Sequence, residues 1–250
     1  MTDRPLALIT GGARRVGRAI ALELARAGCD LIVTYRTSAS EAHTLVEQAA
    51  AAGARATTEH LDLEDVDAVD AWATALATRL PRLDVLVHNA SVYEPCPLDE
   101  VTAGRAERDL RVHAISPLLL SARLAPLLRD SPRPGGGCVV CLCDIHAGGL
   151  PRRGFAPYAI SKAALAELVR SLAIDLAPDA RAVGVAPGVV QWPDEGYESD
   201  DASREAYLAR VPLRRSGTPE EAARLVRFLA LESTYITGQI VPIDGGRSLR

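Results

Sequence analysis

This sequence has few aromatic residues, no long apolar run and no large surplus of charge of one sign. The last two absences each exclude a class of protein. Aromatics make up only 4% of 250 residues. No run approaches the roughly 18 apolar residues of a membrane-spanning helix, so we expect no membrane partner. The net charge of −4 comes from interspersed acids and bases, which argues against nucleic acid as a partner. Residues 1–5 lead straight into an apolar run, so a cytoplasmic protein is expected.

The five cysteines raise the question of a metal site, because Cys138, Cys141, Cys143 and His146 lie close together in sequence. An odd number of cysteines argues against a disulfide framework. The run 137–143 is typical of a strand, in which alternate side chains point to opposite faces. Cys138 therefore faces away from the other two, and such ligands cannot close around one ion. Small buried hydrophobic side chains are favoured over zinc, and we expect no metal.

Short apolar runs alternate with Ala- and Leu-rich helical patterns along the whole chain, and no linker or repeat divides it. This alternation predicts an α/β fold: one doubly wound Rossmann-type domain over residues 1–250, with a parallel sheet covered by helices on both faces. The seven expected strands are 6–10, 30–35, 55–61, 83–88, 137–143, 181–186 and 239–243. Helices are expected before residue 28 and at 40–52, 64–79, 101–129, 158–176 and 218–231.

The turn after the first expected strand contains Gly11, Gly12 and Gly17, and a helix follows it. This order aims backbone N–H groups and the positive end of a helix at a phosphate. The spacing differs from Gly-x-Gly-x-x-Gly, and an ordinary tight turn is the alternative. Its place after the first strand favours a dinucleotide site. Asn89 ends the fourth expected strand, at the sheet edge where α/β proteins bind ligands.

The end of the second expected strand bears on the choice of cofactor. An acidic residue there usually binds the ribose of NAD(H), but this chain has Arg36, Thr37 and Ser38. A guanidinium and two hydroxyls suit a 2′-phosphate, and Arg14 or Arg15 can reach the same group. A solvated loop arginine is the alternative. The sequence therefore favours NADP(H) over NAD(H).

Tyr158 and Lys162 lie four residues apart in a segment that Pro157 opens and that reads as a helix. Residues at this spacing share one face, so the ammonium group is expected beside the phenol. A fixed positive charge lowers the pKa of a tyrosine, whereas an ionised Asp144 nearby would push the pKa of Tyr158 back up. A chance pair on an amphipathic helix is the alternative. Asp62, after the third strand, either accepts from an adenine amino group or caps the next helix.

With these residues in order, the chain resembles the short-chain dehydrogenase/reductase family over essentially its full length. The resemblance rests on residues 10–17, Asn89-Ala90, Tyr158-x-x-x-Lys162, Pro187-Gly188 and Asp244-Gly245-Gly246. Within the family it looks most like the pteridine reductases, through residues 10–17, 89–93, 144–147 and 188–193. The resemblance implies NADPH-dependent reduction of pterins, dihydropterins or, in some members, dihydrofolate, by a homotetramer with a seven-stranded sheet.

The resemblance also implies roles for individual residues. The implied catalytic residues are Asp144, Tyr158 and Lys162. The implied cofactor-binding residues are Gly11, Arg14, Arg15, Val16, Gly17, Tyr35, Arg36, Thr37, Ser38, Asp62, Leu63, Asn89, Ala90, Ser91, Tyr158, Lys162, Pro187 and Gly188. The implied substrate-binding residues are Arg15, Ser91, Tyr93, Asp144, Tyr158 and Trp192. A polar, acidic substrate loop is expected at about 188–213.

Three features depart from the wider family pattern. Most members have serine where Asp144 stands, whereas the pteridine reductases have aspartate. The interval from Asp144 to Tyr158 is one residue longer than in the family, and Gly148-Gly149 can absorb the extra residue. His113 stands where the wider family has an asparagine that acts through backbone geometry and a water.

Two other functions compete with pteridine reduction. A ketone reductase acting on a 3-oxoacyl thioester is the first, and Asp144 argues against it because a carboxylate cannot donate to a carbonyl oxygen as serine does. An idle nucleotide-sensing protein is the second, and the presence of both Tyr158 and Lys162 argues against it. For a pterin, Tyr93 is expected to hold the flat ring against the nicotinamide. Packing beneath its own loop is the alternative for Tyr93.

Overall fold

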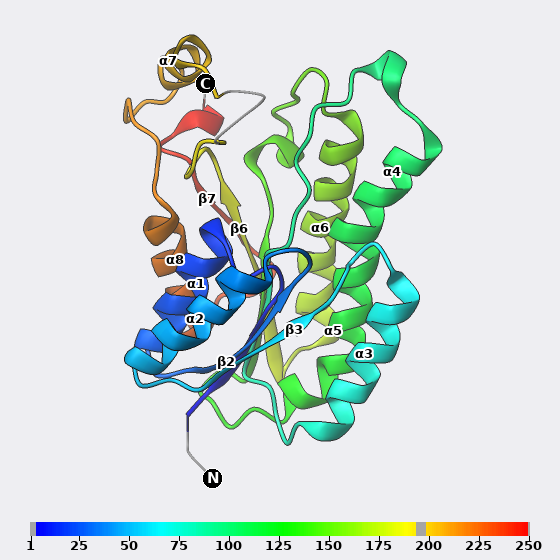
Figure 1. The fold of residues 1–250 in the computed structure, drawn as a ribbon, viewed down its shortest axis with the longest axis vertical. Helices are drawn as coiled ribbons and strands as arrows, with labels where there is room; N and C mark the ends of the chain where they lie inside the picture. Colours follow the sequence, from blue (N-terminus) through cyan, green and yellow to red (C-terminus); the bar gives the residue numbers. More distant parts are fainter. Residues whose placement is uncertain (1–3, 194–198, 250) are drawn as a thin grey trace.

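A parallel sheet of seven strands runs through the molecule in the order β3-β2-β1-β4-β5-β6-β7 (Figure 1). The computed structural model describes residues 4–193 and 199–249. The strands are β1 (Leu6–Ile9), β2 (Asp30–Tyr35), β3 (Ala56–His60), β4 (Val85–His88), β5 (Gly137–Leu142), β6 (Ala180–Pro187) and β7 (Ile240–Ile243). The strand order reverses between β1 and β4, which makes this a doubly wound Rossmann-type sheet and confirms the predicted fold class.

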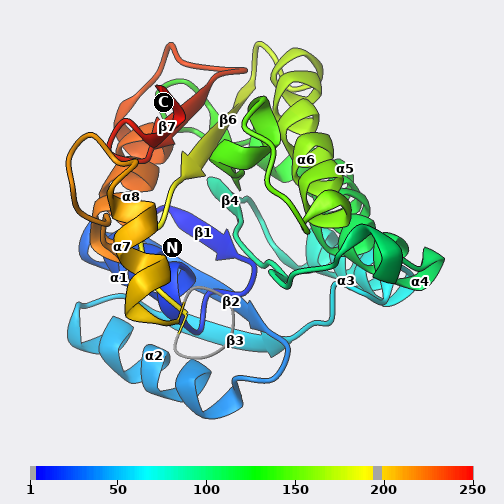
Figure 2. The same ribbon diagram turned by 90° about the horizontal axis from the view of Figure 1, so that it is seen from above.

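Helices cover both faces of this sheet. The longer helices are α1 (Arg15–Arg26), α2 (Ala39–Ala51), α3 (Val66–Arg79), α4 (Ala103–Leu110), α5 (Ser116–Arg129), α6 (Ala156–Asp175), α7 (Asp201–Leu208) and α8 (Pro219–Arg227). The short helical turns are η1 (Leu98–Glu100), η2 (Arg111–Ile115), η3 (Ile145–Gly148), η4 (Phe228–Glu232) and η5 (Arg247–Leu249). Figure 2 shows α1, α2 and α8 on one face of the sheet, and α3, α4, α5 and α6 on the other.

The central strands are apolar along their whole length because helices pack on both sides of them. Every residue of β4 and β5 is buried. Cys138 packs into the core on the α1 and α8 side, whereas Cys141 and Cys143 pack on the α5 and α6 side. The predicted opposite orientation of these cysteines is therefore confirmed. Burial raises the pKa of the Cys138 thiol to about 11, so it stays protonated and unreactive.

The segment predicted as one helix over 101–129 is two helices, α4 and α5, joined by the wide π-helical turn η2. Pro117 supplies the reason. Its ring nitrogen carries no hydrogen, so the carbonyl group of His113 loses the partner that an α-helix would offer four residues later. The wider turn leaves His113 fully buried between α6 and the loop after β4.

Helix α7 was not predicted, because it lies inside the segment 188–213 that we expected to be a loop. Asp200 caps this helix by accepting from the backbone N–H of Ser203, and Tyr207 anchors it in a buried position. Residues 194–198 of the expected substrate loop lie outside the described residues. Across residues 4–193 and 199–249, no helix has the length and apolar character needed to cross a membrane.

Candidate active site

A cavity of about 560 Å³ lies at the carboxyl ends of the strands, where open α/β sheets bind ligands. All of the predicted cofactor-binding residues line it. The predicted substrate-binding residues that line it are Arg15, Ser91, Tyr93, Asp144 and Tyr158. The fold thus gathers residues from six strand ends into one space large enough for a small-molecule substrate and part of a cofactor.

The glycine-rich turn between β1 and α1 packs so closely that a side chain would not fit. A Cβ atom on Gly17 would lie 2.4 Å from Asn89 Nδ2 and 2.4 Å from the carbonyl oxygen of Gly11. Gly11 has a φ of 61°, a left-handed conformation that glycine adopts without strain. The turn therefore presents main chain to the cavity, and the first turn of α1 begins there.

Side-chain hydrogen bonds lock the ends of β1 and β4 together. Thr10 Oγ1 accepts from the backbone N–H groups of Asn89 at 3.1 Å and Ala90 at 3.2 Å. Asn89 Nδ2 donates to the carbonyl oxygens of Thr10 and Gly11, each at 3.0 Å. Two motifs that lie far apart in the sequence are therefore held as one rigid wall of the cavity.

Arg15 joins this wall to the loop after β6. Its φ of 51° is unusual for a residue other than glycine and stores backbone strain of the kind found at functional sites. Its guanidinium group donates to the carbonyl oxygens of Gln191 and Trp192, each at 3.3 Å. The side chain therefore spans the side of the cavity that leads toward α7.

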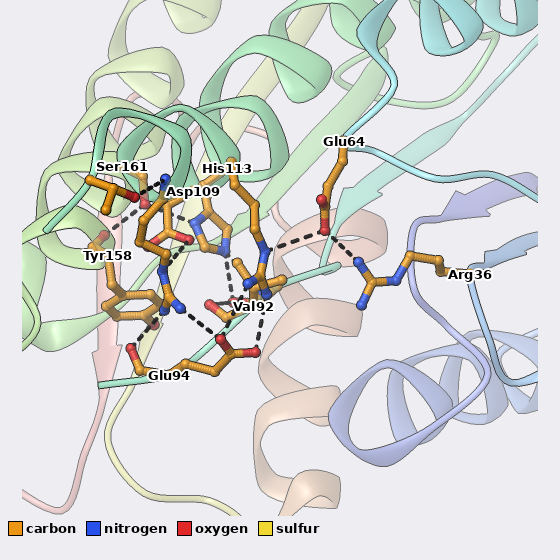
Figure 3. Close-up of polar contacts among 12 residues, drawn as sticks. Arg36, Glu64, Val92, Glu94, Asp109, His113, Tyr158 and Ser161 are labelled. Carbon is orange, nitrogen blue, oxygen red and sulfur yellow. Dashed lines mark hydrogen bonds and ion pairs between the residues drawn. The ribbon is translucent and has the colours of Figure 1, made fainter. Parts of the chain in front are cut away.

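Arg36 lies at the end of β2 and is half-exposed. Its guanidinium donates to Glu64 Oε1 at 2.5 Å, and Glu64 also pairs with Arg108 at 3.3 Å (Figure 3). Arg108 continues the chain of charges to Glu94, which follows Tyr93. The predicted phosphate ligand is therefore held by a carboxylate, with which any 2′-phosphate bound at Arg36 would have to compete. The sequence suggested a phosphate ligand or a solvated loop arginine, and neither interpretation included the ion pair of Arg36 with Glu64.

Asp62 does not cap the helix that follows it. Asp65 takes that role, since its side chain accepts from the backbone N–H of Ala68 at the start of α3. Asp62 Oδ1 instead accepts from the backbone N–H of Glu64 at 3.0 Å, while the residue lines the cavity. This local turn fixes the backbone of Glu64, which holds Arg36.

Tyr158 and Asp144 form the polar centre of the cavity. The Tyr158 hydroxyl donates to Asp144 Oδ2 at 2.7 Å, and Asp144 Oδ1 accepts from the backbone N–H of His146 at 2.7 Å. The longer interval between the two residues is taken up by the helical turn η3, which Asp144 caps, and by Gly149 with a φ of 108°. Asp144 therefore reaches Tyr158 despite the extra residue.

The pKa of Tyr158 is raised well above 10, first by burial, then by the negative charge of Asp144 and the bond to it. The net shift follows burial and the expected effect of Asp144, and not the lowering expected from Lys162. Lys162 Nζ donates to the Leu142 carbonyl oxygen at 2.7 Å and lies 5.9 Å from the centre of the Tyr158 ring. Burial also lowers the pKa of Lys162 itself. Tyr158 therefore carries its proton at neutral pH.

Replacing Asp144 with Asn is expected to lower the pKa of Tyr158, because the charge that disfavours phenolate is removed. Tyrosinate absorbance isolates this titration as the difference between each protein and its Tyr158→Phe counterpart. In the Asp144→Asn pair the difference signal should rise at a lower pH than in the pair that retains Asp144. An unchanged midpoint would show that Asp144 does not control the phenol.

Tyr93 belongs to an aromatic cluster beside the Tyr158 hydroxyl. Its ring stacks on Phe155 with centroids 4.9 Å apart and meets Tyr158 edge-on at 5.0 Å. Arg152 donates to the Tyr93 hydroxyl and lies over the Phe155 ring. Tyr93 is still 40% exposed and lines the cavity, so packing inside its own region covers only part of the ring. Sequence reasoning missed Phe155 and Arg152, although both lie just before the Tyr158 helix.

Trp192 was predicted to contact substrate, but it is not among the described residues that line the cavity. Its ring meets Tyr207 of α7 edge-on at 5.5 Å, and the guanidinium of Arg204 lies over it at 5.7 Å. Helix α7, absent from the prediction, gives the ring an aromatic partner. Tyr207 lines the cavity in its place, and its hydroxyl accepts from the backbone N–H of Val189 at 3.0 Å.

Comparison with known proteins agrees with this geometry. The family described as enoyl-(acyl carrier protein) reductase matches residues 11–248. The chain belongs to the short-chain dehydrogenase/reductase family. An uncharacterized oxidoreductase of Mycobacterium tuberculosis is 34% identical to it over 98% of this chain and 92% of its own length. The 3-oxoacyl-[acyl-carrier-protein] reductase FabG of Pseudomonas aeruginosa is 34% identical over 96% of each chain.

Among solved structures, FolM alternative dihydrofolate reductase 1 from Brucella canis, complexed with NADP, has a TM-score of 0.87 and 29% identity. The match covers 98% of this chain and 94% of that chain. As a short-chain dehydrogenase/reductase, the protein is an oxidoreductase, and its family uses nicotinamide cofactors. By their names, the Pseudomonas aeruginosa protein is a 3-oxoacyl-[acyl-carrier-protein] reductase and the Brucella canis protein is a dihydrofolate reductase. The choice between these two substrates for the present protein depends on its site.

Proposed function

We propose that this short-chain dehydrogenase/reductase is an NADPH-dependent pteridine reductase, which transfers a hydride to a pterin or dihydropterin and accepts dihydrofolate as a further substrate. The observation that carries this proposal is the 2.7 Å bond from Tyr158 to Asp144. A carboxylate accepts hydrogen bonds but cannot donate to a carbonyl oxygen as serine does. The Tyr158–Asp144 pair therefore suits a substrate edge that carries nitrogens and N–H groups.

The residues present fit an NADP(H) cofactor. Gly11 and Gly17 leave no room for a side chain, so the backbone can approach a pyrophosphate, and Arg15 is the first residue of α1. Arg36, with Thr37 and Ser38, offers charge and hydroxyls to a 2′-phosphate. Lys162 borders the same cavity and is available to the nicotinamide ribose. When bound, NADPH supplies the hydride.

Tyr158 holds the proton that the reduced ring requires. Its raised pKa keeps the phenol protonated at neutral pH, and Asp144, itself fixed by His146, orients the hydroxyl. Transfer of this proton to a ring nitrogen leaves a phenolate on Tyr158. The ammonium group of Lys162, 5.9 Å from the ring centre, offsets that charge.

Tyr93 is proposed to form the surface on which the pterin ring lies. Changing Tyr93 to Ala should weaken pterin binding by roughly 1 to 3 kcal/mol, because the flat ring loses its aromatic contact. NADPH affinity should change little, since the adenosine and pyrophosphate contacts lie elsewhere. Both dissociation constants can be measured by titration, that for NADPH on the enzyme alone and that for dihydrobiopterin on the NADP⁺ complex.

Tyr93→Phe is the matched control for that substitution. It keeps the ring and its stacking on Phe155, and it removes only the hydroxyl that accepts from Arg152. Pterin binding should stay close to that of the unmodified protein. If Tyr93→Phe and Tyr93→Ala weakened pterin binding equally, the hydroxyl and not the ring face would be the contact.

A 3-oxoacyl thioester reductase is the second candidate, and it is favoured by the 34% identity to FabG of Pseudomonas aeruginosa. The position of Asp144 separates the two candidates, because a ketone reductase needs a donor at that point to hold the carbonyl oxygen. Of the two, the pteridine reductase accounts for both Asp144 and the aromatic cluster around Tyr93.

A cytoplasmic homotetramer is also part of the proposal, as the resemblance to pteridine reductases implies. Ile160 and Ile174 support an assembly of copies, since they are 62% and 79% exposed on α6. Their spacing places both on one face of that helix, and Leu118 of α5 is 50% exposed. Apolar side chains repeated along a helix face are typical of a surface that another copy covers.

A further inference from the structure

His113 lies behind Tyr158, the proposed catalytic residue, at a position where the wider family has asparagine. The imidazole is fully buried in the π-helical turn η2, and its ring meets that of Tyr158 edge-on at 5.5 Å. Figure 3 shows the imidazole between Val92, in the loop after β4, and Ser161 on α6. The asparagine of the wider family does not offer a ring nitrogen there, so the role of His113 has to be derived from its own contacts.

The hydrogen bonds around His113 fix its tautomer. The backbone N–H of Val92 donates to Nε2 at 3.2 Å, so Nε2 carries no hydrogen. The ring hydrogen is therefore on Nδ1, which donates to Ser161 Oγ at 2.8 Å. Ser161 Oγ in turn donates to the carbonyl oxygen of Tyr158 at 2.7 Å, so every hydrogen in this part of the network is used.

The ring is also held neutral. The pKa of His113 is lowered to about 2, first by burial and then by the positive charges of Lys162 and Arg108. A second hydrogen on Nε2 is therefore excluded at any pH at which the enzyme works. Nε2 thus remains an acceptor on the side that faces the cavity wall.

This acceptor determines what Ser91 can do. Ser91 Oγ lies 2.9 Å from His113 Nε2 and 3.3 Å from the Val92 carbonyl oxygen, and the Tyr158 hydroxyl oxygen is also within reach. An imidazole nitrogen is a stronger base than a carbonyl or phenol oxygen, and Nε2 is nearer to Ser91 Oγ than the Val92 carbonyl oxygen is, so it takes the single hydroxyl hydrogen. Its one lone pair is then shared between the Ser91 hydroxyl and the Val92 N–H. The lone pairs of Ser91 Oγ then remain available to accept a hydrogen bond from a group in the cavity, which Ser91 lines.

We propose that His113 is a positioning residue that fixes Ser91 as a hydrogen-bond acceptor, so that the site selects substrates which present an N–H donor at Ser91. The inference rests on the proposed function only in that Ser91 contacts the substrate. With Ser91 and Asp144 both accepting, this wall of the cavity favours an amino-substituted nitrogen heterocycle over an oxoacyl group. Asparagine at position 113 can donate or accept, and therefore does not fix the direction of the Ser91 bond.

The first test is a double-mutant cycle on dihydrobiopterin reduction with saturating NADPH. Ser91→Ala and His113→Asn should each raise the KM for dihydrobiopterin, by roughly five- to a hundredfold for Ser91→Ala and by no more for His113→Asn. The KM for NADPH should stay nearly constant in His113→Asn, because His113 is not among the cofactor-binding residues. In the Ser91→Ala background, His113→Asn should change the KM by less than about twofold. Additive losses in the double variant would overturn the proposal, because His113 would then act without Ser91.

The second test reads the resting enzyme and needs no substrate. In protein labelled with ¹⁵N in histidine, the His113 ring is the one whose signal is lost in His113→Asn, and it should carry its hydrogen on Nδ1 and show no titration between pH 5 and 8. An Nε2–H tautomer, or a titration in that range, would overturn the proposal even if dihydrobiopterin is a substrate. If dihydrobiopterin is not reduced while the Nδ1–H signal is present, the proposed function fails and the tautomer stands.

Discussion

Tyr158→Phe is expected to lower kcat by roughly a hundredfold or more, because it removes the proton donor while keeping the ring. The hydroxyl that is lost donates to Asp144 Oδ2 at 2.7 Å. The ring contacts with Tyr93 and His113 remain, so the cavity keeps its shape. NADPH affinity should be nearly unchanged, and steady-state NADPH oxidation together with NADPH titration measures both quantities.

Tyr235→Phe is the matched control for this substitution. Tyr235 is fully exposed, so removing its hydroxyl tests whether loss of a tyrosine oxygen matters in general. Its kcat should equal that of the unmodified enzyme within experimental error. Full turnover by Tyr158→Phe would remove Tyr158 from the mechanism, whichever substrate is used.

Arg36→Ala should erase most of the preference for NADPH over NADH. A guanidinium paired with a 2′-phosphate is worth roughly 2 to 3 kcal/mol, which corresponds to about thirty- to a hundred-and-fiftyfold in the ratio of affinities. Thr37 and Ser38 remain and account for the residual preference. The ratio of kcat/KM values for the two cofactors, measured before and after the change, gives the result directly.

Glu64→Gln is the informative companion, because Glu64 holds Arg36 by an ion pair. Removing the carboxylate charge frees the guanidinium, so Glu64→Gln should keep or increase the NADPH preference. If Arg36 served only to pair with Glu64, both substitutions would leave that preference unchanged. Equal use of NADH and NADPH by the unmodified enzyme would show that the loop of residues 36–38 does not select for the 2′-phosphate.

Local patterns were enough to predict the fold. β2 was expected at 30–35 and is found at Asp30–Tyr35, because a buried parallel strand is apolar along its length and turn residues bound it. The glycine turn was recognisable because its glycines stand between the first expected strand and a helix. Helical spacing predicted that Tyr158 and Lys162 share one face, and the other motifs of the chain distinguished them from a chance pair. These features are encoded by neighbours in sequence, which is why sequence reasoning reached them.

Features that depend on contacts between distant segments were not predictable in the same way. The ion pair of Arg36 with Glu64 joins β2 to the loop before α3, and nothing local indicates it. Trp192 packs against α7, a helix that the polar composition of its segment did not indicate. The net pKa shift of Tyr158 depends on burial, which spacing on a helix does not report. The bonds of His113 likewise exist only once η2, α6 and the β4 loop are assembled.

The most direct test of the central claim compares substrates on the unmodified enzyme. Values of kcat/KM with NADPH should be measured for dihydrobiopterin, dihydrofolate and an acetoacetyl thioester under one set of conditions. The Asp144 and Tyr158 pair predicts that dihydrobiopterin is reduced at least about tenfold more efficiently than the thioester. A thioester preferred over both pterin and folate would contradict the pteridine assignment, and would leave the fold and the short-chain dehydrogenase/reductase family in place.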